Sequence, residues 1–227
     1  MKLSDDLATR LTQLQDPLIF LEHCVFTQDE VDRKNPIKYA PVDRGYVQTL
    51  TAVWSDLVHG RLDGSVLIVD KSRRMWVSWL FKALHLHYSF TNICRRVGIV
   101  SKKAEDSFSH LRDMEFIWRN IPDSIYPAKY RPEMRVKEGF IFFDEIDSAI
   151  HGIASGPDQT RQYGFSCLFF DEFDFWEKQE PTYGAAEPTL KGGGVLTIAT
   201  THAPTDTGLD TFYRCMVEDR IDEYYEV

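Results

Sequence analysis

The sequence contains few cysteines and no long apolar run, and each absence excludes a class of protein. Its four cysteines form no CxxC pair and no metal-ligand spacing: Cys24, Cys94, Cys167 and Cys215. We therefore expect reduced thiols and no disulfide framework. The longest apolar runs, such as residues 66–69 and 167–170, have the length of a strand and are far too short to span a membrane. The opening residues 1–6 also lack the apolar stretch of a signal peptide.

A net positive charge is missing as well. The formal net charge of the 227-residue chain is −9, which argues against a protein that coats nucleic acid by bulk attraction. Residues 139–227 hold 17 acidic and 5 basic side chains, which leaves 18 acidic and 21 basic side chains in residues 1–138. Any contact with a polyanion must therefore be local, and the first part of the chain holds most of the basic residues.

The composition supports one substantial core, because 43% of the residues are hydrophobic and 13% are aromatic. Apolar residues spaced by three and four predict a helix over residues 3–26, and the polar residues 27–45 with two prolines predict a loop. A second helix is expected over residues 46–59. The predicted organisation is an N-terminal helix and loop, residues 1–45, followed by one main domain, residues 46–227.

The main domain alternates between strands and helices. Strands are expected at residues 66–69, 97–100, 167–170 and 195–199, and helices at residues 76–90, 102–120 and, in part, 177–186. Residues 135–143 and 148–154 resemble a hairpin. Short apolar strands separated by helices predict an α/β fold with a mostly parallel central sheet and helices on both faces. In such sheets ligands bind at the carboxyl ends of the strands, and three of those ends carry polar groups suited to chemistry.

The first of these strand ends is the segment KSRRMWVSW, residues 71–79. A strand, a short loop and a helix that opens with Ser form the layout of a phosphate-binding loop, and the helix N-terminus offers free N–H groups to a triphosphate. Lys71, Arg73 and Arg74 can neutralise phosphate oxygens, and Ser78 stands where such a loop holds Mg²⁺. The match to the GxxxxGK[ST] pattern is incomplete, and the alternative is a basic turn before a buried aromatic helix.

The second strand end is the apolar run 167–170, followed by Asp171 and Glu172. In a Mg²⁺-assisted NTPase the Asp binds the water shell of the ion and the Glu polarises the attacking water. Asp144 and Glu145 follow an apolar run in the same way. We prefer the later pair because Asp144 falls between the two segments of the predicted hairpin, where it would be a solvated turn residue. An exposed acidic turn is also the alternative for Asp171 and Glu172.

The third strand end is the segment VLTIATTH, residues 195–202. An apolar strand that ends in Thr200 and Thr201 can place hydroxyl groups beside the other two strand ends, where they could sense a γ-phosphate. The alternative is ordinary strand composition, since Thr is a good strand residue.

Together these segments resemble the N-terminal ATPase domain of phage terminase large subunits, the DNA-packaging motors. The resemblance covers nearly the whole chain from about residue 18, and it depends on four segments: KSRRMWVSW (71–79), VGIVSKKAEDS (97–107), GIASGPDQTRQYGFSCLFFDE (152–172) and EPTLKGGGVLTIATTHAP (187–204). The first is similar to the family's deviant Walker A motif, the third runs into the Walker B motif, and the fourth approaches the coupling motif. The implied fold is a P-loop NTPase of the additional-strand type.

The resemblance also implies residue roles. Lys71 would contact the β- and γ-phosphates and Arg73 a second phosphate position, Asp171 would join Ser78 at Mg²⁺, and Glu172 would activate water. The whole loop is expected to bind ATP: Lys71, Ser72, Arg73, Arg74, Met75, Trp76, Val77 and Ser78. Outside the loop, Tyr46 and Gln48 fall in the adenine-contacting segment, Thr200 and Thr201 would couple hydrolysis to movement, and Arg161 matches an arginine finger given to a neighbouring subunit. The alternative for Arg161 is a surface residue in a polar loop.

The implied function is ATP hydrolysis with Mg²⁺ that drives double-stranded DNA into a procapsid in the host cytoplasm. The implied partners are the portal protein, the small terminase subunit and further copies of the chain in a ring. No membrane partner is expected. Because residues 224–227 resemble an unfinished strand, we expect a fragment without the family's nuclease domain, and no DNA cleavage.

One departure keeps other functions open. The family's loop has Gly where Trp76 stands, and a Trp there requires a different loop geometry. This favours an alternative of another class, a nucleic-acid-binding or assembly module that keeps the fold but has weak or lost ATP turnover. A helicase-like ATPase is a third possibility, because it would share all the loop chemistry.

Overall fold

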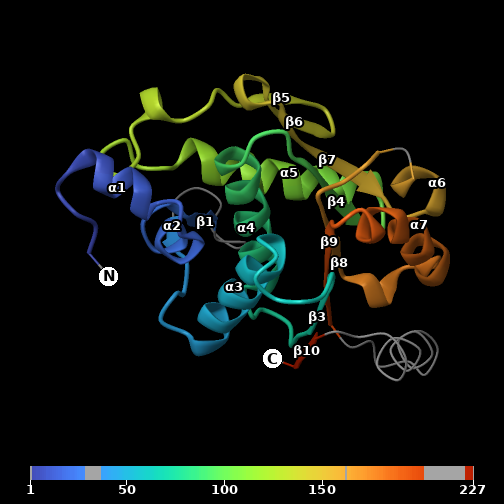
Figure 1. The fold of residues 1–227 in the computed structure, drawn as a ribbon. Helices are drawn as coiled ribbons and strands as arrows, with labels where there is room; N and C mark the ends of the chain where they lie inside the picture. Colours follow the sequence, from blue (N-terminus) through green and yellow to red (C-terminus); the bar gives the residue numbers. More distant parts are fainter. Residues whose placement is uncertain (1, 29–36, 162, 202–222, 227) are drawn as a thin grey trace.

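The computed structural model describes residues 2–28, 37–161, 163–201 and 223–226 of the chain (Figure 1). Its centre is a sheet of eight strands in the order β10-β3-β9-β8-β4-β7-β6-β5. The strands of this sheet are β3 (Val66–Asp70), β4 (Arg96–Ser101), β5 (Arg135–Lys137), β6 (Phe140–Phe143), β7 (Ser148–Ala154), β8 (Cys167–Asp171), β9 (Val195–Thr200) and β10 (Glu223–Glu226).

The sheet is mostly parallel, as the alternating sequence predicts. Every neighbouring pair from β10 to β7 is parallel, and within the described part of this sheet the antiparallel pairs are β7–β6 and β6–β5, at one edge. Strand β9 lies between β3 and β8, so one extra strand separates the two strands whose ends carry the basic loop and the acidic pair. This arrangement confirms the α/β fold of the additional-strand type.

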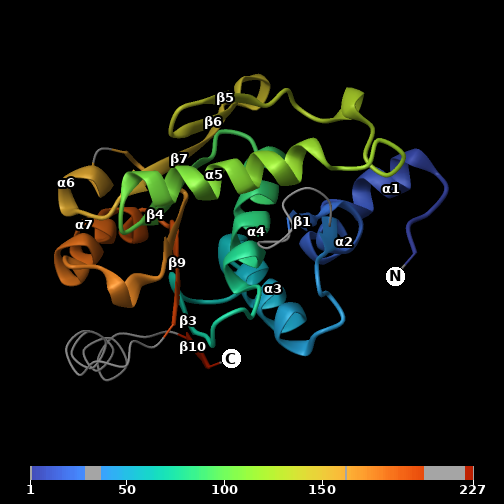
Figure 2. The ribbon, with the colours of Figure 1, turned by 180° about the vertical axis from the view of Figure 1, so that it is seen from behind.

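Helices cover both faces of the sheet (Figures 1 and 2). On one face lie α3 (Gly45–Val58), α4 (Val77–Thr91) and α5 (Ala104–Arg119), and on the other α6 (Pro157–Thr160) and α7 (Gln179–Lys191). The side chains of β8 explain this arrangement, because Cys167 and Phe169 pack into one hydrophobic cluster and Leu168 and Phe170 into the other. A strand that is apolar at every position needs cover on both faces.

The single helix predicted over residues 3–26 is wrong. The structure has two helices there, α1 (Leu7–Gln13) and α2 (Pro17–Cys24). Asp16 starts the second helix, since its Oδ1 accepts hydrogen bonds from the backbone N–H groups of Leu18 and Ile19 at 2.8 and 3.4 Å. Pro17 suits the first helical position, where a backbone N–H would have no partner in the helix. Buried residues of α2, such as Phe20, pack into the same cluster as α3 and α4.

The loop predicted over residues 27–45 is also incomplete. The short strands β1 (Phe26–Gln28) and β2 (Ile37–Tyr39) pair antiparallel there, while residues 29–36 lie outside the described part of the chain. Helix α3 follows and confirms the helix predicted over residues 46–59 to within one residue. Three-residue strands in a polar segment carry too little apolar periodicity to be recognised.

The predicted hairpin is confirmed as the antiparallel pair β6–β7, which turns through the 3-10 helix η2 (Asp144–Ile146). A further turn at Gly139, with φ of +76°, splits the expected first segment into β5 and β6. Two more 3-10 helices are η1 (Ala128–Tyr130) and η3 (Phe173–Phe175). None of the helices in the described residues is long and apolar enough to cross a membrane.

Helix α5 starts later than the predicted helix over residues 102–120. Ser101, the residue before the predicted helix, is the last residue of β4, and the capping position is held by Lys103 without a side-chain hydrogen bond. The acidic side chains of Glu105 and Asp106 in the first turn stabilise the helix start through its dipole.

Candidate functional site

The three strand ends singled out in the sequence meet at one edge of the sheet. Strands β3, β9 and β8 are parallel and in register, with Asp70 opposite Thr200 and Asp171 opposite Ala199. A cavity of about 610 Å³ opens at this edge. The loop and the acidic pair line it together with residues of β4 and α5: Lys71, Arg73, Arg74, Met75, Trp76, Val77, Ser78, Trp79, Ser101, Lys102, Asp106, Ser109, His110, Asp171, Glu172 and Phe175.

The backbone of the loop adopts conformations that glycine favours, although no glycine is present. Arg74 and Trp76 have φ of 65° and 63°, in the left-handed region. Each such residue with a Cβ costs about 1–2 kcal/mol relative to the right-handed region. Trp76 is also the N-cap of α4, and its carbonyl accepts the backbone N–H of Leu80 at 2.9 Å. Trp76 therefore forms a left-handed turn at this position, held under strain.

Two contacts hold this loop. The Tyr46 hydroxyl donates a 2.6 Å hydrogen bond to the carbonyl oxygen of Met75, so α3 fixes the loop from outside. The ring of Trp76 packs at the edge of the main core, and its Nε1 is buried without a hydrogen-bond partner in the described part of the chain. Helix α4 carries no acidic residue in its first turn, which keeps its N-terminus favourable for an anion.

Lys71 brings the three strand ends into direct contact. Its ammonium group lies 2.7 Å from Glu172 Oε1 and 3.1 Å from Thr201 Oγ1. The Lys71 side chain is 6% exposed, whereas that of Glu172 is 40% exposed. The backbone N–H of Lys71 donates to the carbonyl oxygen of Thr200. A buried ammonium beside a helix N-terminus can form a charge-assisted hydrogen bond with a phosphate oxygen.

Ser78 and Asp171 form the second contact across the sheet edge. The Ser78 hydroxyl donates to Asp171 Oδ1 at 2.8 Å, and His110 Nε2 lies 3.1 Å from Oδ2 of the same carboxylate. Burial acts to raise the pKa of Asp171, but the hydrogen bond and charge of His110 and the charges of Lys71 and Lys82 outweigh it, so the pKa lies below its usual value. The carboxylate is therefore charged at neutral pH, as a cation ligand must be.

The sequence alone does not reveal His110 and Lys82, two residues near Asp171. His110 is a single histidine on an amphipathic helix, and its partner Asp171 lies on a distant strand. Lys82, one turn after Ser78, is 4% exposed and forms a 2.7 Å ion pair with Asp113 of α5. No local spacing connects these residues, although His110 and Asp113 stand three positions apart on one face of α5.

Asp144 and Glu145 do not belong to this site. Strand β6 is antiparallel to β7, so its carboxyl end lies at the opposite edge of the sheet from that of β8. Asp144 is exposed there and accepts hydrogen bonds from Arg135 Nε and Nη2 at 2.6 and 2.8 Å. The hydrogen bond from Arg135 lowers the pKa of Asp144. The preference for Asp171 and Glu172 thus agrees with where the structure places them.

The remaining predicted residues are spread more widely. Ser72 is exposed at the loop, as are Arg73 and Arg74 at the cavity. Thr200 is buried, and its hydroxyl accepts the backbone N–H of Asp174 at 2.9 Å. Gln48 and Arg161 are not brought to the cavity.

These two outlying residues sit at separate places. Gln48 is exposed, donates to the carbonyl oxygen of Val42 and lines a different cavity of about 480 Å³. Arg161 is exposed at the C-terminal end of α6.

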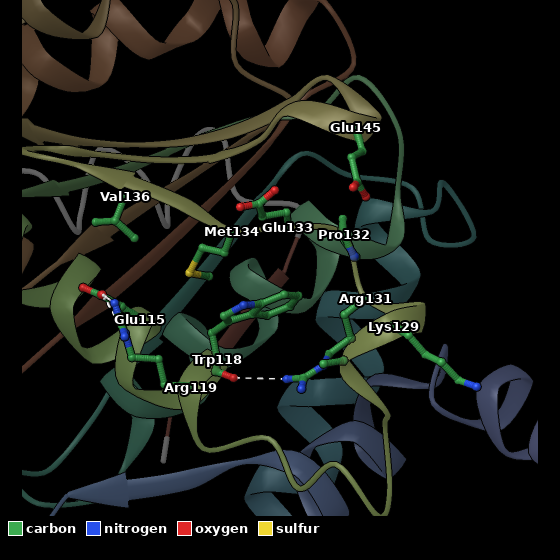
Figure 3. Close-up of a pocket in the computed structure, with 11 residues that line it drawn as sticks. Glu115, Trp118, Arg119, Lys129, Arg131, Pro132, Glu133, Met134, Val136 and Glu145 are labelled. Carbon is green, nitrogen blue, oxygen red and sulfur yellow. Dashed lines mark hydrogen bonds and ion pairs between the residues drawn. The ribbon is translucent and has the colours of Figure 1, made fainter.

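Another cavity of similar volume, about 610 Å³, lies under the second half of α5 (Figure 3). Trp118 is one of its lining residues, and the guanidinium of Arg131 lies 5.4 Å from that ring and donates to the Trp118 carbonyl oxygen (Figure 3). Of the residues that the sequence suggests for chemistry, Glu145 alone is among the residues that line this cavity. Charged and apolar side chains mix around it without a cluster suited to catalysis among these lining residues, so the strand-end cavity remains the candidate site.

The oxygen donors at the strand ends fit a magnesium ion accompanied by a phosphate. Ser78 Oγ and Asp171 Oδ1 lie side by side, so the site offers one hydroxyl and one carboxylate oxygen. Mg²⁺ commonly takes one or two such ligands and completes its shell with water and substrate phosphates. Within residues 2–28, 37–161, 163–201 and 223–226, no group of three or more His, Cys, Asp or Glu could hold a metal ion. A phosphate-dependent site is the kind that these residues fit.

The fold and the geometry of the strand ends define the class: this is an α/β P-loop NTPase fold of the additional-strand type. Comparison with solved structures gives the particular relatives. The large terminase of bacteriophage HK97 matches with a TM-score of 0.65 and 10% identity, over 91% of this chain and 42% of that chain. The large terminase of the thermophilic bacteriophage D6E in complex with ADP matches with a TM-score of 0.53 and 12% identity, over 76% of this chain and 44% of that chain.

These likenesses establish a shared fold. The chain spans less than half the length of either large terminase. No protein-family model matches the sequence, and no curated protein matches it. The predicted resemblance to large terminases is thus confirmed at the level of the fold, at 10–12% identity.

Proposed function

We propose that this chain is the ATPase motor part of a terminase large subunit, which hydrolyses ATP with Mg²⁺ to move double-stranded DNA into a procapsid. The observation that carries the proposal is the contact of Lys71 with Glu172 and Thr201, next to the contact of Ser78 with Asp171. Loop, acidic pair and threonine come from three separate strand ends. Their meeting in the fold of large terminases supports nucleotide chemistry at this edge.

The loop would bind the phosphates of ATP. Lys71 would take the β- and γ-phosphates, the exposed guanidinium groups of Arg73 and Arg74 would neutralise further oxygens, and the free N–H groups at the start of α4 would complete the cradle. Ser72, Met75, Trp76 and Val77 would contribute contacts along the loop. Tyr46 would act by holding the loop at Met75, and Gln48 would have to reach the adenine from outside the cavity.

Ser78 and Asp171 would hold Mg²⁺, which would neutralise charge on the phosphates. Glu172 is suited to orient and polarise the attacking water, because its side chain is 40% exposed and lies within the cavity. Thr201 touches both Lys71 and Glu172, at 3.1 and 3.4 Å, and Thr200 contacts the backbone of η3. This pair would report the state of the phosphates to β9 and to the chain beyond it.

Arg161 would serve a neighbouring subunit. It is exposed and lies outside the cavity of its own chain, as a finger that acts between copies in a ring requires. The partners proposed from the terminase likeness are double-stranded DNA, the portal protein and the small terminase subunit, in the host cytoplasm. The net charge of −9 requires that contact with DNA be local.

Thermal unfolding with and without Mg²⁺ and ATP tests the proposal. ATP at about 100 times its dissociation constant stabilises a folded protein by about 2.7 kcal/mol, which corresponds to a rise in Tm of about 5–10 °C for a domain of this size. We expect this rise for the native chain and for Lys103→Ala, an exposed lysine outside the cavity, and its loss in Lys71→Ala.

The outcomes separate the candidate functions. Absence of a shift at millimolar ATP in the native chain would overturn the proposal and favour a binding or assembly module without turnover. ATP-dependent separation of DNA strands would instead favour a helicase-like ATPase. Hydrolysis that is stimulated by double-stranded DNA without strand separation is the result expected for a packaging motor.

A further inference from the structure

Both oxygens of the Asp171 carboxylate have partners, and the partners come from two different helices. Oδ1 accepts the Ser78 hydroxyl of α4 at 2.8 Å, and Oδ2 lies 3.1 Å from His110 Nε2 of α5. The Asp171 side chain is 5% exposed and that of His110 is 15% exposed. The carboxylate is therefore held in one orientation by a hydroxyl at one oxygen and an imidazole at the other.

The surroundings of the His110 imidazole indicate which of its ring nitrogens carries the proton. Its Nδ1 is buried and has no hydrogen-bond partner among the described residues. An N–H at that position would remain unpaired, which costs about 1–3 kcal/mol when buried. The geometry therefore places a proton on Nε2, from which His110 donates a hydrogen bond to Asp171. Carboxylates that ligate metal ions are commonly held by hydrogen bonds of this kind.

Helix α5 is fastened next to this contact by a second one. Asp113, three residues after His110, pairs with Lys82, four residues after Ser78, at an N–O distance of 2.7 Å. Lys82 is 4% exposed and also lies 4.2 Å from the centre of the Trp79 ring. Residues three and four apart share one face of a helix, so this ion pair joins α4 and α5 next to the Ser78–Asp171–His110 contact. It holds α5, the helix that carries His110, against α4 by a contact in which His110 takes no part.

We propose that His110 is a positioning residue that orients Asp171 and thereby sets the affinity of the site for the Mg²⁺ that accompanies the nucleotide. This inference rests on the proposed function, because it assigns a role within the same site. His110 acts through Asp171: it holds Oδ2 and leaves the Ser78 side of the carboxylate for the ion. Loss of such a supporting hydrogen bond typically lowers metal affinity about 10–100-fold.

The test measures binding and does not depend on turnover. Calorimetric titration of ATP at a series of Mg²⁺ concentrations gives the concentration that half-saturates the Mg²⁺-dependent part of the affinity. We expect His110→Ala to raise this concentration about 10-fold, and to leave ATP binding without Mg²⁺ unchanged. His110→Gln places an amide N–H near the position of Nε2 and should recover most of the affinity.

Matched variants exclude a general effect of changing α5. Arg112→Ala alters an exposed position on the same helix and should leave the Mg²⁺ dependence of the native chain intact. If His110→Ala unfolds below the working temperature, His110→Asn replaces it, since the shorter amide keeps a polar group but withdraws the donor from Oδ2. An affinity gap between the Gln and Asn variants then tests the same hydrogen bond.

The outcomes distinguish this inference from the proposed function. If the native chain binds no ATP, or binds it without any dependence on Mg²⁺, both ideas fail. If the native chain shows Mg²⁺ dependence and the His110 variants match it, only the role of His110 is overturned. A loss of turnover at saturating Mg²⁺ with unchanged Mg²⁺ affinity would also overturn it, because His110 would then act on the reacting groups.

Discussion

Lys71 and Glu172 are 101 positions apart in the chain and lie 2.7 Å apart in the structure. The ion pair links the start of the loop to the end of β8 across the intervening strand β9. It engages both groups that nucleotide chemistry would need, the buried ammonium and the partly exposed carboxylate. A phosphate that approaches Lys71 must therefore compete with Glu172, and this competition can be measured.

Glu172→Gln should separate binding from hydrolysis. The substitution removes the negative partner of Lys71, so we expect ATP affinity to stay equal or rise by about 2- to 10-fold, which corresponds to less than about 1.4 kcal/mol. Hydrolysis should fall by at least about 100-fold, since the water loses its polarising carboxylate. Equilibrium binding and phosphate release measure the two effects. Glu145→Gln is the matched control, and full turnover in Glu172→Gln would contradict the assignment.

We expect Trp76→Gly to be more stable than Trp76→Ala, the reverse of the usual order of Gly and Ala in helices. Both variants lose the indole, but only Ala keeps a Cβ on a backbone with φ of 63°. We expect Trp76→Gly to have a free energy of unfolding about 1 kcal/mol higher than Trp76→Ala, although Gly normally destabilises a helix start relative to Ala. Denaturation in urea gives the difference. Equal stability of the two would show that the left-handed turn at this position carries no strain.

The free energy of unfolding should decrease as the pH falls below neutrality. Burial lowers the pKa of His85 and of His87 to about 4, from an ordinary value of 6.5. The pKa of His151 is also lowered to about 4, by burial and by the charge of Arg96. Below pH 6.5 the unfolded chain therefore takes up three protons that the folded chain refuses until about pH 4, so stability is lost by about 1.4 kcal/mol per pH unit for each histidine. The lowered pKa of Asp171 takes effect below this window, near and under its usual value of 3.8.

Urea denaturation at pH 7, 6 and 5 measures this slope. His85→Phe keeps a ring that can stack on Phe169 and should reduce the slope by about one proton. A slope that is identical in the native chain and in this variant would mean that His85 takes up its proton while folded.

Arg161→Ala should impair hydrolysis only through neighbouring copies. If the residue acts between subunits, its removal leaves ATP binding intact and lowers turnover by about 10³-fold. Mixing subunits that carry Arg161→Ala with subunits that carry Glu172→Gln should then recover activity, because the second type supplies Arg161 to the intact site of the first. Absence of recovery in mixtures that do assemble would assign Arg161 to its own surface loop.

Much of the fold follows from local sequence. The strand predicted at residues 167–170 is observed as Cys167–Asp171, because four consecutive apolar side chains have no other buried arrangement between two polar turns. The two faces of the sheet follow from the same run. The apolar periodicity does not reveal the helix break at Asp16 and Pro17, because leucines continue at helical spacing on both sides of it. The capping side chain and the proline outweigh that periodicity.

Some residues of the candidate site could likewise be predicted from the sequence, and others could not. Lys71, Ser78 and the acidic pair could be predicted because each stands at a fixed offset from a strand end. His110 could not, since its position relative to Asp171 depends on how α5 crosses the sheet. Trp76 gave the opposite difficulty: its side chain predicts a changed loop, yet its backbone takes the conformation that glycine favours. Residue type and backbone conformation are separate constraints, and only the first is visible in a sequence.

Strand β9 hydrogen-bonds to β3 on one side and to β8 on the other, and it ends at Thr200, which Thr201 follows directly. Neighbouring residues on a strand point in opposite directions, so Thr201 reaches Lys71 while Thr200 reaches the backbone of Asp174. One inserted or deleted residue between Gly194 and Thr200 would exchange the two hydroxyls even if every apolar position stayed filled. Natural variants of this chain should therefore vary freely in which aliphatic residues build β9, and hardly at all in how many.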